Sequence, residues 1–252
     1  MNNYQFDRLE VRVYENAEEM SIVAAKYAGE YLRSRIARQN SARVIWATGS
    51  SQIAFLEKLT KIPNISWQKI TGLHLDEYLG IDREHPASFR RYLRDRLAQK
   101  VPFADFHYIE GDSEQPLREC DRYTRLLQQG EIDLCCLGVG DNGHLAFNDP
   151  WVADFDDPDW VKLVKLDPQN RQQQCDRGDF ANLEAVPAYA FTLALPAIFS
   201  AQMLLCLVSG APKAAIVAQM LTGDISPTCP ASGLRDRPNA ILFLDREAAR
   251  LL

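Results

Sequence analysis

The chain has 252 residues, of which 46% are hydrophobic and 25% charged, so it can bury a substantial core as one domain spanning 1–252. Acidic residues number 34 against 28 basic ones, giving a formal net charge of -6, and no block of Lys and Arg forms a stripe along which nucleic acid would bind. The polar, acidic N-terminus lacks the pattern of a signal peptide, and the six cysteines form no CxxC pair, which favours a reducing cytoplasm and argues against a zinc site.

Helical and strand patterns alternate along most of the chain. In chain order they predict a helix over 17–39, a strand over 43–47, a helix over 53–59, a strand over 72–75, a helix over 88–100 capped by Ser88, a strand over 106–109, a helix over 117–129, strands over 132–137, 190–193 and 204–208, a helix over 211–221, a strand over 240–244 and a helix near the C-terminus. This alternation predicts an α/β fold, a mostly parallel Rossmann-like sheet with helices on both faces. Such sheets bind ligands beyond the carboxyl ends of their strands.

Two segments depart from this regular alternation. From about 151 to 187 the periodicity fades, which we interpret as an irregular lid, the other interpretation being a solvated surface loop. Residues 190–208 are apolar enough to suggest a membrane span, but prolines, polar residues and a Ser-Gly turn interrupt them. We therefore expect two buried strands joined by a turn, and no membrane association.

Several features could bind an anion. Gly49, Ser50 and Ser51 lie between a strand and a helix, where backbone N–H groups and hydroxyls converge on a phosphate. Lys213 lies in the first turn of a predicted helix, where the helix dipole repels a cation unless an anion binds there. Arg171 can add a planar fork of donors suited to phosphate oxygens. Taken singly, these are equally the features of an ordinary turn and of ordinary surface charges.

Two further clusters carry groups suited to proton transfer. Asp76 and Glu77 end an apolar strand, and because side chains alternate along a strand, only one of them faces the ligand crevice and the other is structural. The run 138–149 combines glycines, His144 and carboxylates directly after the most apolar predicted strand. A histidine beside carboxylates can have its tautomer fixed, so this run is the strongest local signal of a catalytic site.

Taken together, three motifs in this order resemble a known enzyme family. They are Ala47-Thr-Gly-Ser50, then Leu75-Asp-Glu-Tyr78 followed by His85-Pro86 and Ser88-Phe-Arg90, and finally Gly138-Val-Gly-Asp-Asn-Gly-His-Leu-Ala-Phe-Asn-Asp-Pro150. The chain is similar in these motifs, from about residue 44 to 244, to the glucosamine-6-phosphate deaminase (isomerase) family, which is related to the 6-phosphogluconolactonases. The resemblance implies aldose–ketose isomerisation and deamination of a hexosamine 6-phosphate to fructose 6-phosphate and ammonium, with no metal and no organic cofactor.

The resemblance also implies roles for individual residues. It makes Asp76 the proton-transferring base and His144 the acid/base of ring opening, with Asn142 and Asp149 orienting the histidine. Strand alternation then turns Glu77 toward a structural role. The residues that the resemblance implies around the substrate are Gly49, Ser50, Ser51, Glu77, Tyr78, Gly143, Ala146, Arg171 and Lys213.

The chain departs from the family pattern at three positions. The acidic residue that orients the histidine is usually a glutamate, and here Asp149 is one methylene shorter. Gln52 stands where the family has a proline after the Gly-Ser turn, and Asn142 is neutral where some members have an aspartate. No matching allosteric residues are present at the N-terminus. The preferred epimer of the sugar stays open, and a homo-oligomer is compatible with the sequence.

Two alternative functions share this fold. A 6-phosphogluconolactonase would use a similar histidine to activate water at an ester, but lactonases favour Asp-Glu-Arg where this chain has Asp76-Glu77-Tyr78. The run 147–150 also resembles a deaminase more than a lactonase. A sugar-phosphate effector domain of a transcription regulator would bind without turnover, but the first 40 residues show no helix-turn-helix pattern.

Overall fold

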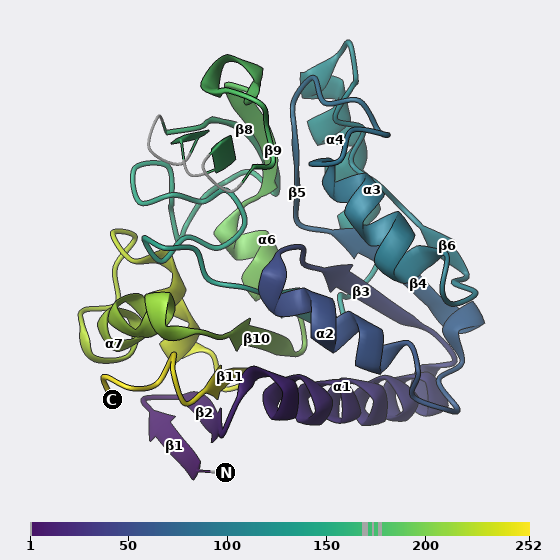
Figure 1. Cartoon of the computed structure of the whole chain (residues 1–252). Coiled ribbons are helices and arrows are strands. Elements are labelled where there is room, and N and C mark those ends of the chain that lie inside the picture. Colours follow the sequence, from purple (N-terminus) through teal and green to yellow (C-terminus); the bar gives the residue numbers. More distant parts are fainter. Residues whose placement is uncertain (1, 168–170, 173, 176–177) are drawn as a thin grey trace.

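The computed structural model describes the chain except residues 1, 168–170, 173 and 176–177. Its main sheet has eight strands in the order β1-β2-β11-β10-β7-β3-β4-β6 (Figure 1). These strands are β1 (Asn2–Phe6), β2 (Leu9–Tyr14), β3 (Ala42–Trp46), β4 (Ile70–His74), β6 (Asp105–Phe106), β7 (Leu134–Leu137), β10 (Leu204–Val208) and β11 (Ala240–Asp245). All neighbouring strands are parallel except the pair β1 and β2. The predicted mostly parallel α/β fold is therefore confirmed.

The helices of the described residues are α1 (Ala17–Gln39), α2 (Ser50–Leu59), α3 (Phe89–Leu93), α4 (Pro116–Leu127), α6 (Leu195–Phe199) and α7 (Ala214–Thr222). Four of the helices, α1, α2, α4 and α7, begin and end within about three residues of the predicted boundaries, whereas α3 is shorter than predicted and α6 was not predicted. At the start of α1, the side chain of Asn16 accepts a hydrogen bond from the amide of Glu19, and Asn40 ends the helix in the left-handed conformation. Helices α1 and α2 lie side by side (Figure 1).

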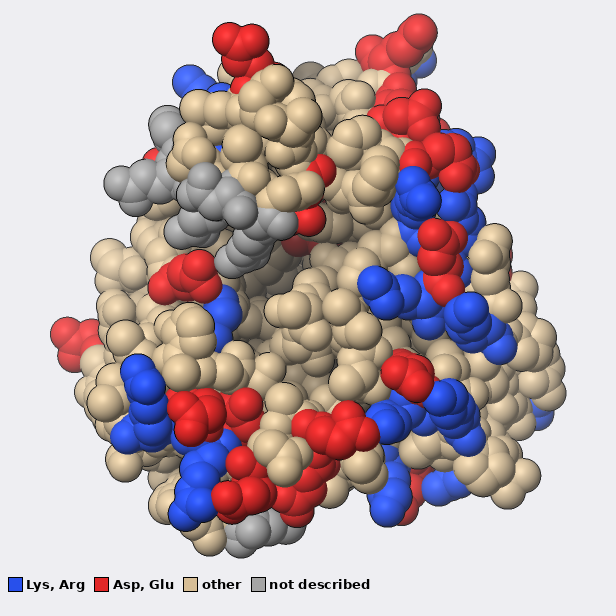
Figure 2. Space-filling view, viewed as in Figure 1, with Lys and Arg blue, Asp and Glu red and all other residues tan. Residues whose placement is uncertain are grey.

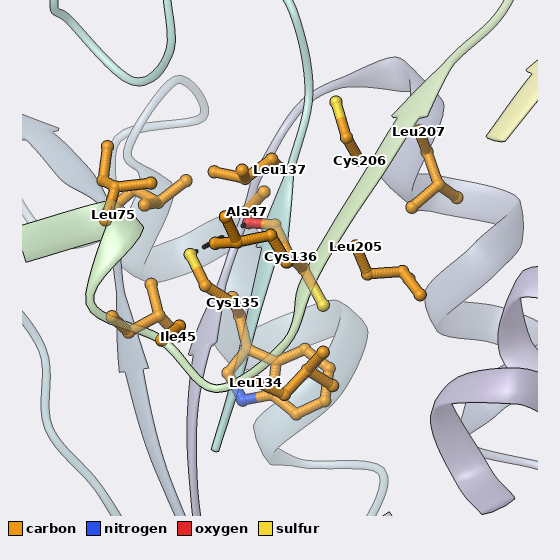
Figure 3. Close-up of a cluster of buried hydrophobic side chains, with 14 of the residues drawn as sticks. Ile45, Ala47, Leu75, Leu134, Cys135, Cys136, Leu137, Leu205, Cys206 and Leu207 are labelled. Atoms are coloured by element: carbon orange, nitrogen blue, oxygen red, sulfur yellow. Dashed lines mark hydrogen bonds between the residues drawn. The ribbon is translucent and has the colours of Figure 1, made fainter. Parts of the chain in front are cut away.

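The central strands are buried on both faces. Every side chain of β7, β10 and β11 is buried, and because strand side chains alternate between the two faces, both faces of the sheet are covered. Figure 3 shows Cys135, Cys136 and Cys206 among leucine side chains in this core. Burial raises the pKa of the Cys206 thiol to about 12, so these cysteines pack as small hydrophobic residues, as predicted.

A second, smaller sheet lies beside the main one and was not predicted. Its three antiparallel strands are β5 (Asp76–Tyr78), β9 (Tyr189–Leu193) and β8 (Val161–Lys165), in that order. Strand β5 follows β4 after a single residue, Leu75, so the chain passes directly from one sheet to the other. Part of the second sheet packs in an apolar cluster of its own, which includes Tyr78, Phe147 and Phe180, while Phe191 and Leu193 on β9 belong to the main core.

Four local predictions differ from the structure. The N-terminal residues form the hairpin β1–β2, which was not predicted, and the residues after β11 form turns where a helix was expected. The predicted helix 88–100 consists of the short helix α3 followed by a π-helical turn, Arg94–Ala98. The predicted pair of strands in 190–208 is separated by helix α6 rather than by a turn alone.

The segment 151–187, predicted as a lid, contains strand β8 and a 3-10 turn, Leu183–Ala185. Part of that segment lies outside the described residues, and closure over a ligand stays a prediction. In the described part of the chain, no helix combines the length and apolarity needed to cross a membrane.

Candidate active site

The predicted site loops follow strands of the main sheet at their carboxyl ends, except the segment of Arg171, which follows β8 of the small sheet. The chain order reverses between the neighbours β3 and β7, because β4 and β6 extend the sheet to one side and β10 and β11 to the other. The loop after β3 carries Ser50, and the loop after β7 carries His144. Open α/β sheets bind ligands at such a reversal point, so the topology brings the loops of Ser50 and His144 to the edge of the sheet where a ligand is expected. In Figure 2 the surface is hollowed above the start of α2.

Asp76 begins strand β5 immediately beyond the end of β4. Its side chain is 7% exposed, and among the described residues no group hydrogen-bonds to its carboxyl. Burial, followed by the neighbouring charge of Glu77, raises the pKa of Asp76 well above its usual value. A carboxylate with a raised pKa is a stronger base, which suits a group that removes a proton from carbon.

Glu77 points away from Asp76 and is fully buried. Its carboxylate accepts hydrogen bonds from the Ser88 hydroxyl (2.8 Å) and from the amides of Phe89 (3.1 Å) and Arg90 (2.9 Å), all at the start of α3. It also accepts one from the amide of Tyr78 (3.0 Å). The side chain thus anchors α3 to β5 and offers no exposed atom to a substrate, which fits the structural role inferred from strand alternation and not the substrate contact inferred from the resemblance.

Tyr78 is also buried, at 2% exposure. Its ring packs against Phe89, Phe147 and Phe180, with ring centroids 5.1, 5.3 and 5.4 Å away. The ring therefore belongs to the apolar cluster of the small sheet, in which Phe147 comes from the loop that carries His144.

The loop after β7 is built around the ring of His144. The Gly140 amide donates to the His144 carbonyl (3.0 Å), and the Gly143 amide donates to the Gly140 carbonyl (3.1 Å). A Cβ atom on Gly140 would lie 2.1 Å from Nε2 of His144, so the ring fits only over a glycine. Gly143 has φ +85°, and a Cβ there would lie 2.7 Å from Sγ of Cys229. Ala146, in the same loop, also has a positive φ, +53°.

The tautomer of His144 follows from its hydrogen-bond partners. Oδ1 of Asn142 accepts the backbone amide of His144 (3.1 Å), so this atom is the oxygen, and it lies 2.8 Å from Nδ1 of His144. Oδ1 of Asp149 lies 3.0 Å from the same Nδ1 and also accepts from Nδ2 of Asn142 (2.9 Å). With acceptors on both sides, Nδ1 carries the proton, and Nε2 is the atom left for proton exchange. The side chain of His144 is 22% exposed, whereas that of Asp149 is 2% exposed.

The predicted phosphate loop lies at the start of α2. Gly49 has φ +101° and precedes the helix, and a Cβ built on it meets nothing within 4 Å, so the backbone angle and not packing favours glycine here. Ser50 and Ser51 are the first two residues of α2. The hydroxyl of Tyr92 donates to the Gly49 carbonyl (2.8 Å), which fixes the outer side of the loop.

Gln52 connects this loop to the end of β7. Its buried amide Nε2 donates to the Leu137 carbonyl (3.1 Å) and to the Ser51 hydroxyl (3.2 Å). A proline at this position could make neither contact. The departure from the family pattern therefore ties the predicted phosphate loop to the strand that leads into the His144 loop, a link that the sequence alone did not reveal.

Lys213 reaches the His144 loop from the other side. It ends a 3-10 turn, Ala211–Lys213, before α7, and its Nζ donates to the Val139 carbonyl (2.8 Å) and pairs with the Asp141 carboxylate. The anion expected to relieve the helix dipole is thus supplied here by Asp141. A phosphate bound at this position would share Lys213 with the Asp141 carboxylate or would replace that carboxylate.

Arg171 is bound to its own segment. Its guanidinium donates to the carbonyls of Leu183 (2.8 Å) and Val186 (2.7 Å). Within the part of the chain that the structure describes, Arg171 makes no contact with Ser50 or Lys213. The structure therefore brings His144, Asn142 and Asp149 together, links Lys213 to the same loop, and does not bring Arg171 to them.

Thr192 and Asn148 hold the two predicted catalytic segments together, and the sequence analysis missed both. Thr192 pairs with Asp76 across β5 and β9, and its hydroxyl oxygen accepts from the Phe147 amide (3.1 Å). Nδ2 of Asn148 donates to the carbonyls of Leu145 (2.9 Å) and Leu193 (2.8 Å). Only the pairing of β9 with β5, distant in sequence, reveals this connection.

Over the described residues, no group of three or more His, Cys, Asp or Glu side chains is arranged to hold a metal ion. The site offers a buried carboxyl and an oriented imidazole on two segments that Thr192 joins, and such groups can move protons on a small ligand.

Comparison with known proteins identifies the family of the chain. Residues 15–243 match the family model of glucosamine-6-phosphate isomerases/6-phosphogluconolactonase. A glucosamine-6-phosphate deaminase of Exiguobacterium sibiricum is 34% identical over 242 residues, covering 95% of this chain and 92% of that protein. The solved structure of a monomeric glucosamine-6-phosphate deaminase superposes with a TM-score of 0.88 at 31% identity, covering 96% of this chain and 99% of that one. A 6-phosphogluconolactonase from Shewanella baltica superposes with a TM-score of 0.76 at 17% identity, covering 93% and 97%, which is a likeness of fold alone. The chain belongs to the glucosamine-6-phosphate isomerase/6-phosphogluconolactonase family.

Proposed function

We propose that the protein is an enzyme that converts glucosamine 6-phosphate into fructose 6-phosphate and ammonium. The observation that carries this proposal is that Thr192 joins two segments, one with a buried carboxyl, Asp76, and the other with an imidazole, His144, whose Nε2 is left for proton exchange. The deaminase of Exiguobacterium sibiricum, at 34% identity over nearly the whole chain, supports the same activity.

The first step in this proposal opens the sugar ring. Nε2 of His144 accepts the proton of the C1 hydroxyl and returns it to the ring oxygen as the bond between C1 and that oxygen breaks. The hydrogen bonds from Nδ1 to Asn142 and Asp149 keep the ring oriented and stabilise the imidazolium that forms between the two transfers.

The second step moves a proton between neighbouring carbons. Asp76 removes the C2 proton of the open aldehyde while the carbonyl oxygen takes up the proton that the C2 ammonium group of the substrate releases, which gives an enolamine. Asp76 then returns its proton to C1, and the amine nitrogen is left as an iminium at C2. Water hydrolyses the iminium to the ketone and ammonium, so that atoms and charge balance. A raised pKa lets one carboxyl both take and return this proton.

The phosphate group would bind where α2 begins. The amides after Gly49, the hydroxyls of Ser50 and Ser51 and the charge of Lys213 supply donors and positive potential at this end of the crevice. Arg171 would contribute only after leaving the carbonyls that it contacts here. Gly143 and Ala146 would lie along the sugar, in the loop that carries His144. No metal or organic cofactor takes part in these steps, and we expect the enzyme to work in the cytoplasm.

The test measures ammonia release from glucosamine 6-phosphate, galactosamine 6-phosphate and unphosphorylated glucosamine, with hydrolysis of 6-phosphogluconolactone run in parallel. We expect turnover of a hexosamine 6-phosphate and a far lower kcat/KM for the sugar without phosphate. Hydrolysis of the lactone without ammonia release would make the protein a lactonase. Binding without either reaction would make it an effector domain.

A further inference from the structure

His74 is a buried histidine that the proposed chemistry does not use. It ends strand β4, two residues before Asp76, and has no exposed surface. Its Nε2 lies 2.8 Å from the Ile109 amide, and its Nδ1 lies 3.0 Å from the carbonyl oxygen of Asp76. Both ring nitrogens therefore face backbone groups and neither faces a ligand.

The partners fix the tautomer of this ring. The Ile109 amide can only donate, so Nε2 of His74 carries no proton and accepts that hydrogen bond. The remaining proton lies on Nδ1, which donates to the Asp76 carbonyl. Burial lowers the pKa of His74 to about 3, with the nearby charges of Arg90 and Arg122 acting in the same direction. The ring thus stays neutral at any pH near neutrality and keeps this arrangement.

The ring has little freedom to turn. Tyr108 and Tyr123 pack against it, with ring centroids 5.9 and 6.0 Å away. The hydroxyl of Tyr123 accepts from the His74 amide (2.7 Å) and lies within donating distance of the His74 carbonyl (3.2 Å). The imidazole is accordingly a rigid part of β4 from which a hydrogen bond is directed at Asp76.

That hydrogen bond completes the anchoring of the Asp76 backbone. The peptide plane before Asp76 is held because the Leu75 carbonyl accepts from the Leu193 amide (2.8 Å). The plane after Asp76 is held because its own carbonyl accepts from His74. Since peptide units are planar, holding both planes fixes the two backbone angles at Asp76 and hence the direction of its side chain. This matters where the chain crosses between two sheets and neither sheet alone defines the geometry.

We propose that His74 is a positioning residue for Asp76, acting through the Asp76 carbonyl oxygen and not through the substrate. The proposal rests on the function proposed above, in which Asp76 transfers the proton between C2 and C1.

Two variants of His74 separate its two hydrogen bonds. In His74→Asn, the side-chain amide occupies roughly the position of Nδ1 and can still donate to the Asp76 carbonyl, while the Ile109 amide loses its acceptor. In His74→Gln, the amide reaches roughly the position of Nε2 and can still accept from Ile109, while the Asp76 carbonyl loses its donor. Each variant loses one buried hydrogen bond, so we expect similar losses of thermal stability.

The two variants should differ in kcat. His74→Gln is expected to lower kcat by about 10- to 100-fold with KM within about threefold, because a small misplacement of a reacting group is costly. His74→Asn is expected to keep kcat within about threefold of the unmodified enzyme. Equal losses of kcat in both variants at equal stability would reduce His74 to a packing residue and overturn the proposal.

An NMR measurement and a crystal structure test the role of His74 without relying on enzyme kinetics. If a variant fails to fold, ¹⁵N NMR of the unmodified protein reads the tautomer directly, and a proton on Nε2 of His74 would refute the argument. If the unmodified protein releases no ammonia, the proposed function is wrong independently of His74. A crystal structure of His74→Gln then decides, because an unmoved Asp76 side chain would contradict a positioning role and a displaced one would support it.

Discussion

The two ends of the proposed site are held in different ways. At the chemical end, Nδ1 of His144 is fixed by Asn142 and Asp149, while no described residue hydrogen-bonds to its Nε2 or to the Asp76 carboxyl. At the phosphate end, Lys213 already donates to protein oxygens that an anion would have to displace, and Arg171 is bound to carbonyls of its own segment and not to this loop. The chemical end is therefore preorganised, whereas the phosphate end requires an exchange of partners. Changes at the first should lower kcat, and changes at the second should move KM.

The largest effect is expected for Asp76→Asn. The amide keeps the volume of the carboxyl but cannot accept a proton. We therefore expect kcat for ammonia release to fall by up to about 10⁴-fold, while KM stays within a few-fold of the value for the unmodified enzyme. Steady-state kinetics with glucosamine 6-phosphate measures both. Near-normal kcat in this variant would remove Asp76 from the mechanism.

Glu77→Gln is the matched control for Asp76→Asn. The neutral amide can no longer accept all the hydrogen bonds at the start of α3, so the free energy of unfolding should fall by about 1–3 kcal/mol. The loss of kcat should be much smaller than in Asp76→Asn. Abolished turnover in a well-folded Glu77→Gln protein would reverse the assignment of the two carboxyls.

His144→Gln should lower kcat by about two to four orders of magnitude on the cyclic substrate, because ring opening loses its acid/base group. Binding of the product fructose 6-phosphate, measured by calorimetry, should stay nearly normal, since the phosphate contacts lie elsewhere. An unchanged kcat would exclude His144 from proton transfer.

Gly140→Ala tests the fit of the His144 ring over its loop. The added methyl would overlap the imidazole, so the ring must move and kcat should fall by about 100-fold. Gly130→Ala is the matched control, because a Cβ there lies at an ordinary 3.4 Å from the Arg43 side chain. Equal activity of the two alanine variants would show that the ring position is not critical.

At the phosphate end, substitutions of Lys213 and of its partner Asp141 should change KM in opposite directions. Lys213→Ala is expected to raise KM by about 10-fold or more, through loss of a charged hydrogen bond to the phosphate. Asp141→Asn is expected to lower KM by a few-fold, because it frees Lys213 from a competing carboxylate that is only half-exposed. Substrate titrations of both variants check this. A higher KM in Asp141→Asn would mean that the carboxylate helps to form the site.

The smallest expected effect is a pH-dependent change in the thermal stability of Asp76→Asn. The pKa of Asp76 is raised in the folded protein, so this group stabilises the fold below its unfolded pKa, and that contribution is lost as pH rises through the folded pKa. Asp76→Asn should therefore have a higher Tm than the unmodified protein at pH 8 and no such advantage near pH 4. Thermal melts at the two pH values measure the difference. A variant that gains no stability at pH 8 would indicate that the carboxyl is well solvated.

The main sheet could be predicted because its signals are local. Windows of about twenty residues are enough to recognise the apolar runs at β7 and β10 and the helical spacing of α1. Helix α1 has the predicted bounds. The small sheet could not, because β5 has only three residues and pairs with β9 more than a hundred residues later. Strand β1 could not be predicted either, because its residues 2–5 are exposed and it therefore carries no apolar face that a sequence pattern would show.

The same distinction applies to the site. His144, Asn142 and Asp149 lie within eight residues of one another, so a single motif indicated all three. The role of His74 depends on a hydrogen bond to Ile109, and that of Thr192 on its pairing with Asp76, and no local pattern encodes either contact. The engagement of Lys213 by Asp141 is likewise invisible in the sequence, because 72 residues separate them.

The position of Asp76 at the junction of the two sheets makes catalysis depend on both of them. One face of the small sheet packs in an apolar cluster of its own, whereas Phe191 and Leu193 on β9 belong to the core of the main sheet. Opening of the small sheet would detach β5 from β9, release the backbone of Asp76 from one of its anchors and expose part of the main core. Loss of activity in denaturant should therefore coincide with the fluorescence change of the tryptophans buried in that core, such as Trp46.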